Sequence, residues 1–301
     1  MRRVLWGING LVTDNSPIPP FNEHESLCKT VVAIFGSLDK YALSGKIPYK
    51  PGCTAGSLGI VKVIERGINS NLKLGRAYIT YPLCIDGIYG IDKDGFLSEY
   101  SVIRDECSVE LKSELSTSNY DALAIHYAYL DEVKDRLKEK DLSNLCLVSS
   151  GIDAAIITMY LSSYGFEVTT ITVVNDRILN DLLANYCYKV YSLRKFRTNE
   201  SFDAIIITDS FLLSLNALNL IKPNGLLIIP PTSSIFSNWY ILRSLSISLL
   251  VPKFKGNLEA VLEVINKIPK NLLKNKVLIT KDLDDVSLHA KRYEKIVVHF
   301  T

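Results

Sequence analysis

The sequence lacks the features that mark several large classes of protein. It has no uninterrupted apolar run of about 18 residues, so a transmembrane helix is not expected. The apolar stretch in the N-terminal segment MRRVLWGINGLV is too short for a signal peptide. The net charge is only +2, and no basic stripe is interleaved with aromatic residues. Neither nucleic acid nor a membrane is therefore an expected partner, and we expect a small-molecule substrate.

The sequence also lacks paired cysteines. It contains no C-x-x-C motif, and its six cysteines are scattered singly along the chain. They are Cys28, Cys53, Cys84, Cys107, Cys146 and Cys187. This spacing argues against a disulfide framework and against a cysteine-rich zinc lobe. A reducing, cytoplasmic setting is the simplest interpretation.

The remaining composition is globular, and 301 residues are enough for two ordinary domains. The first 110 residues or so contain short β-branched and aromatic runs separated by Gly, Pro, Asn and Asp. Strands are expected at 27–35, 59–67, 76–83 and 97–103. From residue 119 the pattern changes, because Leu123, Tyr127, Leu130 and Val133 recur at helical spacing and predict a helix over 119–140.

The chain then alternates between strands and helices. Strands are predicted at 145–149, 167–173, 204–208 and 225–230, with helices at 153–164, 176–186 and 211–220. This alternation predicts βαβ units around a parallel sheet. A further strand is expected at 244–251, followed by a helix at 258–268 and strands at 276–280 and 295–300.

The segment SSGIDA, which follows the first of these strands, resembles the dinucleotide fingerprint G-x-G-x-x-G. Its three positions are Ser149, Gly151 and Ala154. Gly151 keeps the position that lets the backbone approach a pyrophosphate, and Ala154 is an accepted third residue. Ser149 would be strained if its φ were positive. The helix N-terminus still offers N–H groups to an anion, with Ser150 as an added hydroxyl donor, so the phosphate cradle is predicted to be weakened and not lost.

Asp153 has two interpretations. Its carboxylate would repel a pyrophosphate, or Ile152 and Asp153 simply begin the helix with the aspartate as a capping residue.

The residue that reads the adenine ribose is expected after the second strand. The candidates there are Asn175, Asp176 and Arg177, and Asp176 could reach a ribose hydroxyl. Arg177, or Arg194 and Lys195, could instead meet a 2′-phosphate. A helix cap at 175–176 is at least as good an interpretation, so the choice between NAD and NADP stays open.

The order of these pieces resembles the medium-chain dehydrogenase/reductase superfamily, which includes the zinc alcohol dehydrogenases. The segments that carry the resemblance are ESLCKTVVAIFGS, GIVKVIERGINSNLKLGRAYITYP, DGFLSEYSVI and SFDAIIITDSFLLSLNALNLIKPNGLLIIPP. The resemblance implies an α/β chain with a GroES-like β domain (1–120 and 255–301) and a Rossmann-type, doubly wound parallel-sheet domain (121–254). It implies an active site in the cleft between them. Ile152, Thr208 and Pro230 join the predicted cofactor site in this way.

The sequence departs from that family at the zinc ligands. Phe35 stands where zinc-dependent members have a cysteine, and the stretch 51–59 contains Cys53 but no His-Glu pair. Cys53 alone cannot hold zinc, and His126 is better interpreted as a packed helix residue. No metal site is predicted.

These observations favour a zinc-independent, NAD(P)-dependent oxidoreductase of the alcohol dehydrogenase or quinone reductase type, acting on a small alcohol, carbonyl or enone. Its polar catalytic groups would be Ser37, Tyr41 and Tyr49, with Tyr89 nearby, although the tyrosines are also explained as packing residues. The alternatives are a degenerate, non-catalytic binding or subunit protein and, less favoured, a methyltransferase. The unprotected apolar strand at 244–251 predicts a homodimer or homotetramer through the sheet edge.

Overall fold

The computed structural model describes residues 1–112, 115, 119–172, 176–192, 200–208, 219–233 and 248–300. The chain divides into two compact units. The first comprises Met1–Ala128, Phe254–Glu259 and Lys274–Thr301, and the second Tyr129–Lys253 and Ala260–Leu273. Residues 260–273 thus group with the second unit, whereas the resemblance placed all of 255–301 in the first. Of the helices in the described part of the chain, none has both the length and the apolar character needed to cross a membrane.

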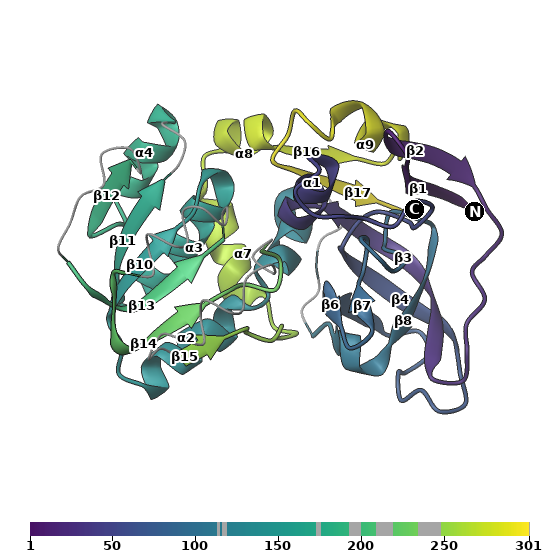
Figure 1. Ribbon diagram of the computed structural model, residues 1–301, viewed down its shortest axis with the longest axis horizontal. Helices are drawn as coiled ribbons and strands as arrows, with labels where there is room; N and C mark the ends of the chain where they lie inside the picture. The colour runs from purple at the N-terminus through teal and green to yellow at the C-terminus, as the bar shows by residue number, and fades with distance from the viewer. Residues whose placement is uncertain are drawn as a thin grey trace. The chain divides into compact units, whose positions relative to one another are not determined.

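The first unit is built on a largely antiparallel sheet with the order β16-β17-β3-β4-β5-β9, in which β8 also pairs with β3. Its strands are β3 (Glu25–Phe35), β4 (Leu58–Arg66), β5 (Ala77–Thr80), β8 (Tyr100–Arg104), β9 (Ser108–Glu110), β16 (Val277–Thr280) and β17 (Lys295–His299). The C-terminal strand β17 runs antiparallel to β3, with Ile296 opposite Phe35. This pairing brings the start of β17 beside the loop that follows β3 (Figure 1).

Two small hairpins and several short helices complete the first unit. The hairpins are β1 (Arg2–Gly7) with β2 (Gly10–Asn15) and β6 (Leu83–Cys84) with β7 (Gly87–Ile88). The helices are α1 (Ser37–Leu43), η1 (Asp105–Cys107), η2 (Asn119–Tyr127) and α9 (Asp284–His289). The N-terminal hairpin was not predicted from the sequence pattern.

The prediction of a single helix over 119–140 is wrong. The chain forms the 3-10 helix η2 and then a separate α-helix, α2 (Leu130–Glu139). Leu123, Tyr127, Leu130 and Val133 are all buried, as the spacing predicted. The pattern therefore predicted correctly which of these side chains are buried. It did not predict the type of helix, because nearly all side chains just before Leu130 are buried and this segment has no polar face that would mark an amphipathic α-helix.

The second unit is built on a six-stranded sheet in which every pairing is parallel. Its strands are β10 (Asn144–Val148), β11 (Glu167–Thr172), β12 (Lys189–Ser192), β13 (Phe202–Ile207), β14 (Ile221–Ile228) and β15 (Ser248–Leu250). Their order in the sheet is β12-β11-β10-β13-β14-β15. In chain order this is 3-2-1-4-5-6, the arrangement of dinucleotide-binding domains.

Helices pack against this sheet (Figure 1). They include α3 (Gly151–Ser163) and α4 (Arg177–Ala184). Near the C-terminus are α7 (Glu259–Lys267) and α8 (Lys270–Lys276), and the sequence boundary between the two units falls within α8. Buried apolar residues of the central strands, among them Cys146, Ile171 and Ile205, form the core. The predicted helix at 211–220 lies almost wholly outside the described residues, as do the first four residues of the predicted strand at 244–251.

Candidate functional site

The strand order places one feature at the centre of the second unit. β10 is flanked by β11 and β13, and the sheet continues from β11 to β12 on one side and from β13 to β14 on the other. The carboxyl ends of β10 and β13 therefore form a switch point, which is where open α/β sheets bind ligands. Ser149 and Ser150 follow β10 at this point, and α3 begins at Gly151.

Gly151 adopts the left-handed conformation, with φ of +57°. A side chain at this φ would be strained, so glycine is the natural residue there. Among the described residues only Asp141 and Asn224 are non-glycine residues with positive φ. Ser149 is therefore not in the strained conformation that would make a serine costly at the first position.

The hydroxyl groups of Ser149 and Thr208 tie the two central strands together. Thr208 Oγ1 donates a hydrogen bond of 2.6 Å to Ser149 Oγ, and both residues are buried. The Thr208 amide also donates to the carbonyl oxygen of Val148, at 3.1 Å. The structure thus brings together two of the predicted cofactor residues, which are hydrogen-bonded to each other at the switch point.

The first turn of α3 differs from the expectation in one detail. The N-cap is Ser150, so Asp153 is not the capping residue and lies instead within the first helical turn. Ile152 and Ala154 are fully buried, whereas Asp153 is half-buried. Burial, together with the Asp153 carboxylate, raises the pKa of Tyr129 well above the ordinary value. Asp153 is thus an acidic residue in the first turn of the helix whose N-terminus would receive a pyrophosphate.

The predicted ribose-reading residues are only partly described. Asn175 lies outside the described residues, as do Arg194 and Lys195. Asp176 is the N-cap of α4, and its Oδ1 accepts hydrogen bonds from the amides of Ile178 (3.1 Å) and Leu179 (3.3 Å). The helix-cap interpretation therefore describes Asp176 in this structure, while Arg177 has an exposed side chain. Pro230 is buried just beyond β14.

A second group of functional side chains lies in the first unit. The side chain of Lys295, at the start of β17, is almost fully buried, and its Nζ is 3.0 Å from Nε2 of the buried His126. The same ammonium group donates to Ser37 Oγ at 3.3 Å. Ser37 is half-buried and is the most exposed of the three. This His126–Lys295–Ser37 cluster was not predicted as a unit, although Ser37 was a predicted catalytic residue.

Close packing around Gly36 makes this cluster possible. A Cβ added at Gly36 would lie only 3.2 Å from His126 Cε1, so the imidazole packs directly against backbone. Lys40 lies near the cluster, and burial together with the charge of Lys295 lowers its pKa to about 8. Basic groups are therefore concentrated around the start of α1, the helix that carries Ser37.

Asp39, on α1, holds the loops around Ser37 in place. Its carboxylate is completely buried and accepts hydrogen bonds from the amides of Gly36, Gly56 and Ser57, each at 3.0 Å. It also accepts a bond of 2.8 Å from the Ser57 hydroxyl. Burial raises its pKa to about 6 even though these hydrogen bonds act in the opposite direction.

The other predicted catalytic residues occupy packing positions. Tyr49 stacks on Trp6, with ring centroids 4.6 Å apart, and its hydroxyl donates to the Gly7 carbonyl oxygen at 3.2 Å. Tyr41 is half-buried on α1, and Lys46 Nζ lies 4.7 Å from the centre of its ring. These contacts fit the packing alternative, and a catalytic role for either tyrosine stays a prediction.

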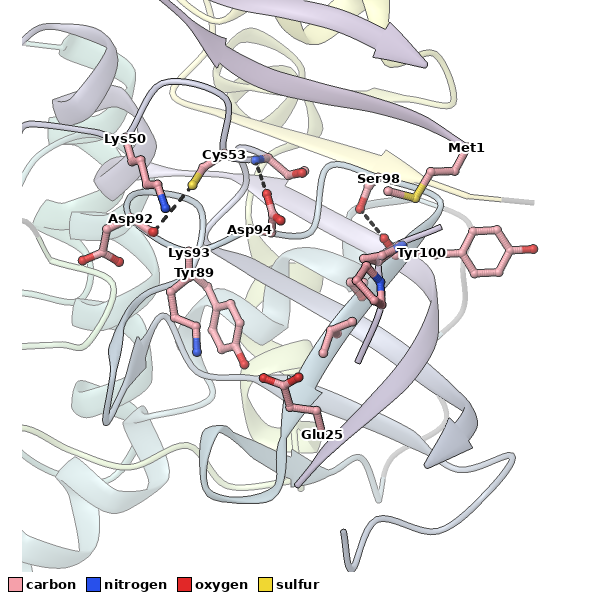
Figure 2. A pocket seen from close by; sticks show the side chains of 16 residues that line it. Met1, Glu25, Lys50, Cys53, Tyr89, Asp92, Lys93, Asp94, Ser98 and Tyr100 are labelled. Carbon is pink, nitrogen blue, oxygen red and sulfur yellow. Dashed lines mark hydrogen bonds between the residues drawn. The ribbon is translucent and has the colours of Figure 1, made fainter. Parts of the chain in front are cut away.

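Tyr89 and Cys53 line a different pocket of about 330 Å³ in the first unit (Figure 2). The Cys53 thiol donates to the Asp92 carbonyl oxygen at 3.5 Å, and Asp94 accepts from the Thr54 amide at 2.7 Å. Burial raises the pKa of the Cys53 thiol, and Asp94 adds to this effect. Cys53 and Asp94 are thus engaged with neighbouring backbone, and Cys53 is poorly suited to act as a thiolate.

The cysteine expectation needs one correction. Cys84 and Cys107 form a disulfide that joins the β6–β7 hairpin to η1, although their separation in the sequence gave no sign of a pair. Together with Glu106 they are also the single group of three residues of metal-ligating type that comes together within the described ranges, although both sulfur atoms are held in the disulfide. Phe35 is fully buried and packs near Trp6, at a ring distance of 6.2 Å.

No protein-family model matches this chain. No curated protein matches it by sequence. Solved structures do match over its whole length. A glucose dehydrogenase from Haloferax mediterranei, in complex with NADP, Zn and gluconolactone, has a TM-score of 0.71 at 14% identity, covering 100% of this chain and 99% of the other.

Two further structures show the same similarity. The alcohol dehydrogenase TADH from Thermus sp. ATN1 has a TM-score of 0.71 at 14% identity, with 100% of both chains covered. The quinone oxidoreductase from Coxiella burnetii has a TM-score of 0.67 at 16% identity, covering 100% of this chain and 99% of that one. The chain therefore has the fold expected from its resemblance to the medium-chain dehydrogenase/reductase superfamily, with a GroES-like and a Rossmann-type domain.

Proposed function

We propose that this protein is an NAD(P)-dependent oxidoreductase that interconverts a small alcohol with its carbonyl compound, or reduces an enone. The observation that carries the proposal is the left-handed Gly151 at the switch point of a 3-2-1-4-5-6 parallel sheet. The similar folds of a glucose dehydrogenase, an alcohol dehydrogenase and a quinone oxidoreductase support it.

The residues at the switch point fit a dinucleotide. The absent side chain of Gly151 leaves backbone open to a pyrophosphate, and the first amides of α3 point out of the helix end as donors. Ser150 and Ile152 would flank the phosphates, and the Asp176 region would face the ribose. A nicotinamide cofactor supplies or accepts a hydride when bound. Asp153 opposes binding electrostatically, so we expect modest affinity.

We further propose that the reaction needs no zinc. The side chain at the position of the first ligand, Phe35, has no donor atom and is buried in the core. Cys53 and His126 do not belong to any three-donor group among the residues that the structure describes. The residues present therefore do not fit a catalytic zinc, which needs three converging protein ligands.

In place of a metal, the His126–Lys295–Ser37 cluster supplies a proton donor. The Ser37 hydroxyl would donate its proton to the carbonyl oxygen of the substrate as that oxygen gains negative charge. The Lys295 ammonium, 3.3 Å from Ser37 Oγ, would stabilise the serine oxygen and return a proton to it. His126 orients Lys295 through the 3.0 Å contact.

Cofactor binding tests the proposal. NADH and NADPH are titrated against the wild-type protein, Gly151→Val and Gly165→Val, with S-adenosylmethionine as a further ligand. Gly165 also has a positive φ, +86°, and a Cβ there would meet nothing within 4 Å. Gly165→Val therefore imposes comparable backbone strain away from the predicted ligand.

We expect the wild type and Gly165→Val to bind NADH or NADPH, and Gly151→Val to lose binding. Equal binding by all three would move the site elsewhere, and binding of S-adenosylmethionine alone would support the methyltransferase alternative. The buried Phe35 and the charge of Asp153 also favour the non-catalytic alternative. That alternative would be supported by cofactor binding without hydride transfer to any of a panel of alcohols, aldehydes, ketones and quinones.

A further inference from the structure

A second polar pocket lies in the first unit, apart from the groups used in the proposed reaction. Its volume is about 340 Å³, within the range of small-molecule sites. It is lined by Arg2, Lys29, Glu99, Tyr100, Lys281, Leu283, His299 and Phe300. Its basic side chains come from four segments. Arg2 is on β1, Lys29 is on β3, His299 is on β17, and Lys281 directly follows β16.

Cationic side chains outnumber carboxylates in the lining of this pocket. Three of the lining side chains are cationic, and Glu99 is the single carboxylate among the lining residues. Glu99 accepts a hydrogen bond of 2.9 Å from the backbone amide of Arg2. The Arg2 guanidinium contacts Asp282 (3.4 Å) and Asp284 (3.1 Å), and both contacts are made by Nη2. Arg2 is thus already paired with two carboxylates outside the lining, and Lys29 and Lys281 are the other cations that line the pocket, so its lining favours an anion.

His299 provides an independent sign of a missing ligand. Its side chain is only 5% exposed, yet neither ring nitrogen has a hydrogen-bond partner within the described part of the chain. Leaving a buried polar group unpaired costs about 1–3 kcal/mol, so such groups are rare unless something else satisfies them. Burial and the charge of Lys281 lower the pKa of His299, which keeps the ring neutral with one N–H to donate.

We propose that this pocket binds a small phosphate monoester, whose phosphate is held by Arg2, Lys29, Lys281 and the N–H of His299. Donors that arrive from four separate segments match the several oxygens of a phosphate better than a planar carboxylate, which one arginine can satisfy. The remaining volume beside Tyr100, Leu283 and Phe300 would take the organic part of the ligand. Tyr100 also lines the neighbouring pocket drawn in Figure 2, so the two pockets share this side chain. The proposal does not depend on the proposed oxidoreductase function.

The test uses the full chain at low ionic strength. Glycerol 3-phosphate, inorganic phosphate and uncharged glycerol are titrated by calorimetry. The ring resonances of His299 are followed by NMR, which distinguishes this pocket from any other phosphate site. Lys281→Gln removes one charge from an exposed pocket side chain, and Lys267→Gln removes the same charge from an exposed residue on α7. Gly151→Val separates this pocket from the switch-point loop.

We expect glycerol 3-phosphate to bind at least as tightly as inorganic phosphate, to shift the His299 resonances, and to bind Lys281→Gln about tenfold more weakly than Lys267→Gln. Gly151→Val should bind it like the wild type. The proposal is overturned if neither phosphate compound binds, or if inorganic phosphate alone binds. It is equally overturned if Lys281→Gln and Lys267→Gln bind alike, or if Gly151→Val abolishes binding.

Discussion

Replacing Asp39 by asparagine should change how the stability of the protein depends on pH. The Asp39 carboxylate is completely buried, and burial raises its pKa from 3.8 to about 6. Between these two values the folded protein holds a proton that the unfolded chain has released. The contribution of Asp39 to stability is therefore fully present below pH 3.8 and is lost as the pH rises through 6.

The size of the effect follows from the same values. One unit of pKa corresponds to about 1.4 kcal/mol. The rise to about 6 therefore makes ionised Asp39 roughly 3 kcal/mol less favourable in the folded protein than in the unfolded chain. The asparagine side chain of the Asp39→Asn variant is neutral at every pH and lacks this dependence. The asparagine carboxamide has one acceptor oxygen, so it can accept fewer than the four hydrogen bonds that the carboxylate accepts, one of which comes from the Gly36 amide. This loss costs about 1–3 kcal/mol at all pH values.

Urea unfolding followed by circular dichroism at pH 4, 5, 6 and 7 measures the difference in unfolding free energy between the wild type and Asp39→Asn. We expect the wild type to lose about 2–3 kcal/mol relative to the variant between pH 4 and pH 7. Asp181→Asn, at an exposed side chain, serves as the control and should track the wild type. A difference that is constant, or that grows in favour of the wild type as the pH rises, would show that the four hydrogen bonds outweigh burial and would refute the reasoning.

Four shorter predictions follow from the proposed function and the sheet edge. Protein purified without added zinc should contain no stoichiometric zinc after dialysis, and one tightly bound zinc per chain would contradict the zinc-free proposal. Asp153→Val should bind NADH or NADPH more tightly, and unchanged affinity would show that Asp153 does not face the cofactor. Ser37→Ala should lower kcat/KM by roughly 100-fold without weakening cofactor binding, whereas Ser37→Thr should retain most activity. Ser248→Pro, on the last strand of the sheet, should weaken a dimer in sedimentation experiments, and a monomeric wild type at micromolar concentration would exclude that dimer.

Much of the fold could be predicted because its signals are local. The alternation of apolar runs and helical segments after residue 140 predicted the parallel sheet, and the predicted edge strand contains the observed strand Ser248–Leu250. The N-terminal hairpin was missed because its residues alternate weakly and only pairing between β1 and β2 orders them. The Cys84–Cys107 pair was missed because the fold of the first unit, and not spacing in the sequence, brings its two segments together. The proposed dimer and the predicted cytoplasmic setting stay predictions.

The two halves of the candidate site differ in how far the sequence could reveal them. The switch-point loop is contiguous, so the fingerprint identified Gly151, and only the backbone angle was needed to show that glycine, and not Ser149, carries the left-handed turn. The His126–Lys295–Ser37 cluster has no such local signal, because 169 residues separate Lys295 from His126 and 258 separate it from Ser37. Only the antiparallel pairing of β17 with β3 brings Lys295 to the loop after Phe35. A buried lysine in a short apolar strand is costly unless it is hydrogen-bonded. The lysine that begins the apolar segment KIVVHF was therefore the available sign that this strand contributes a polar group to a site.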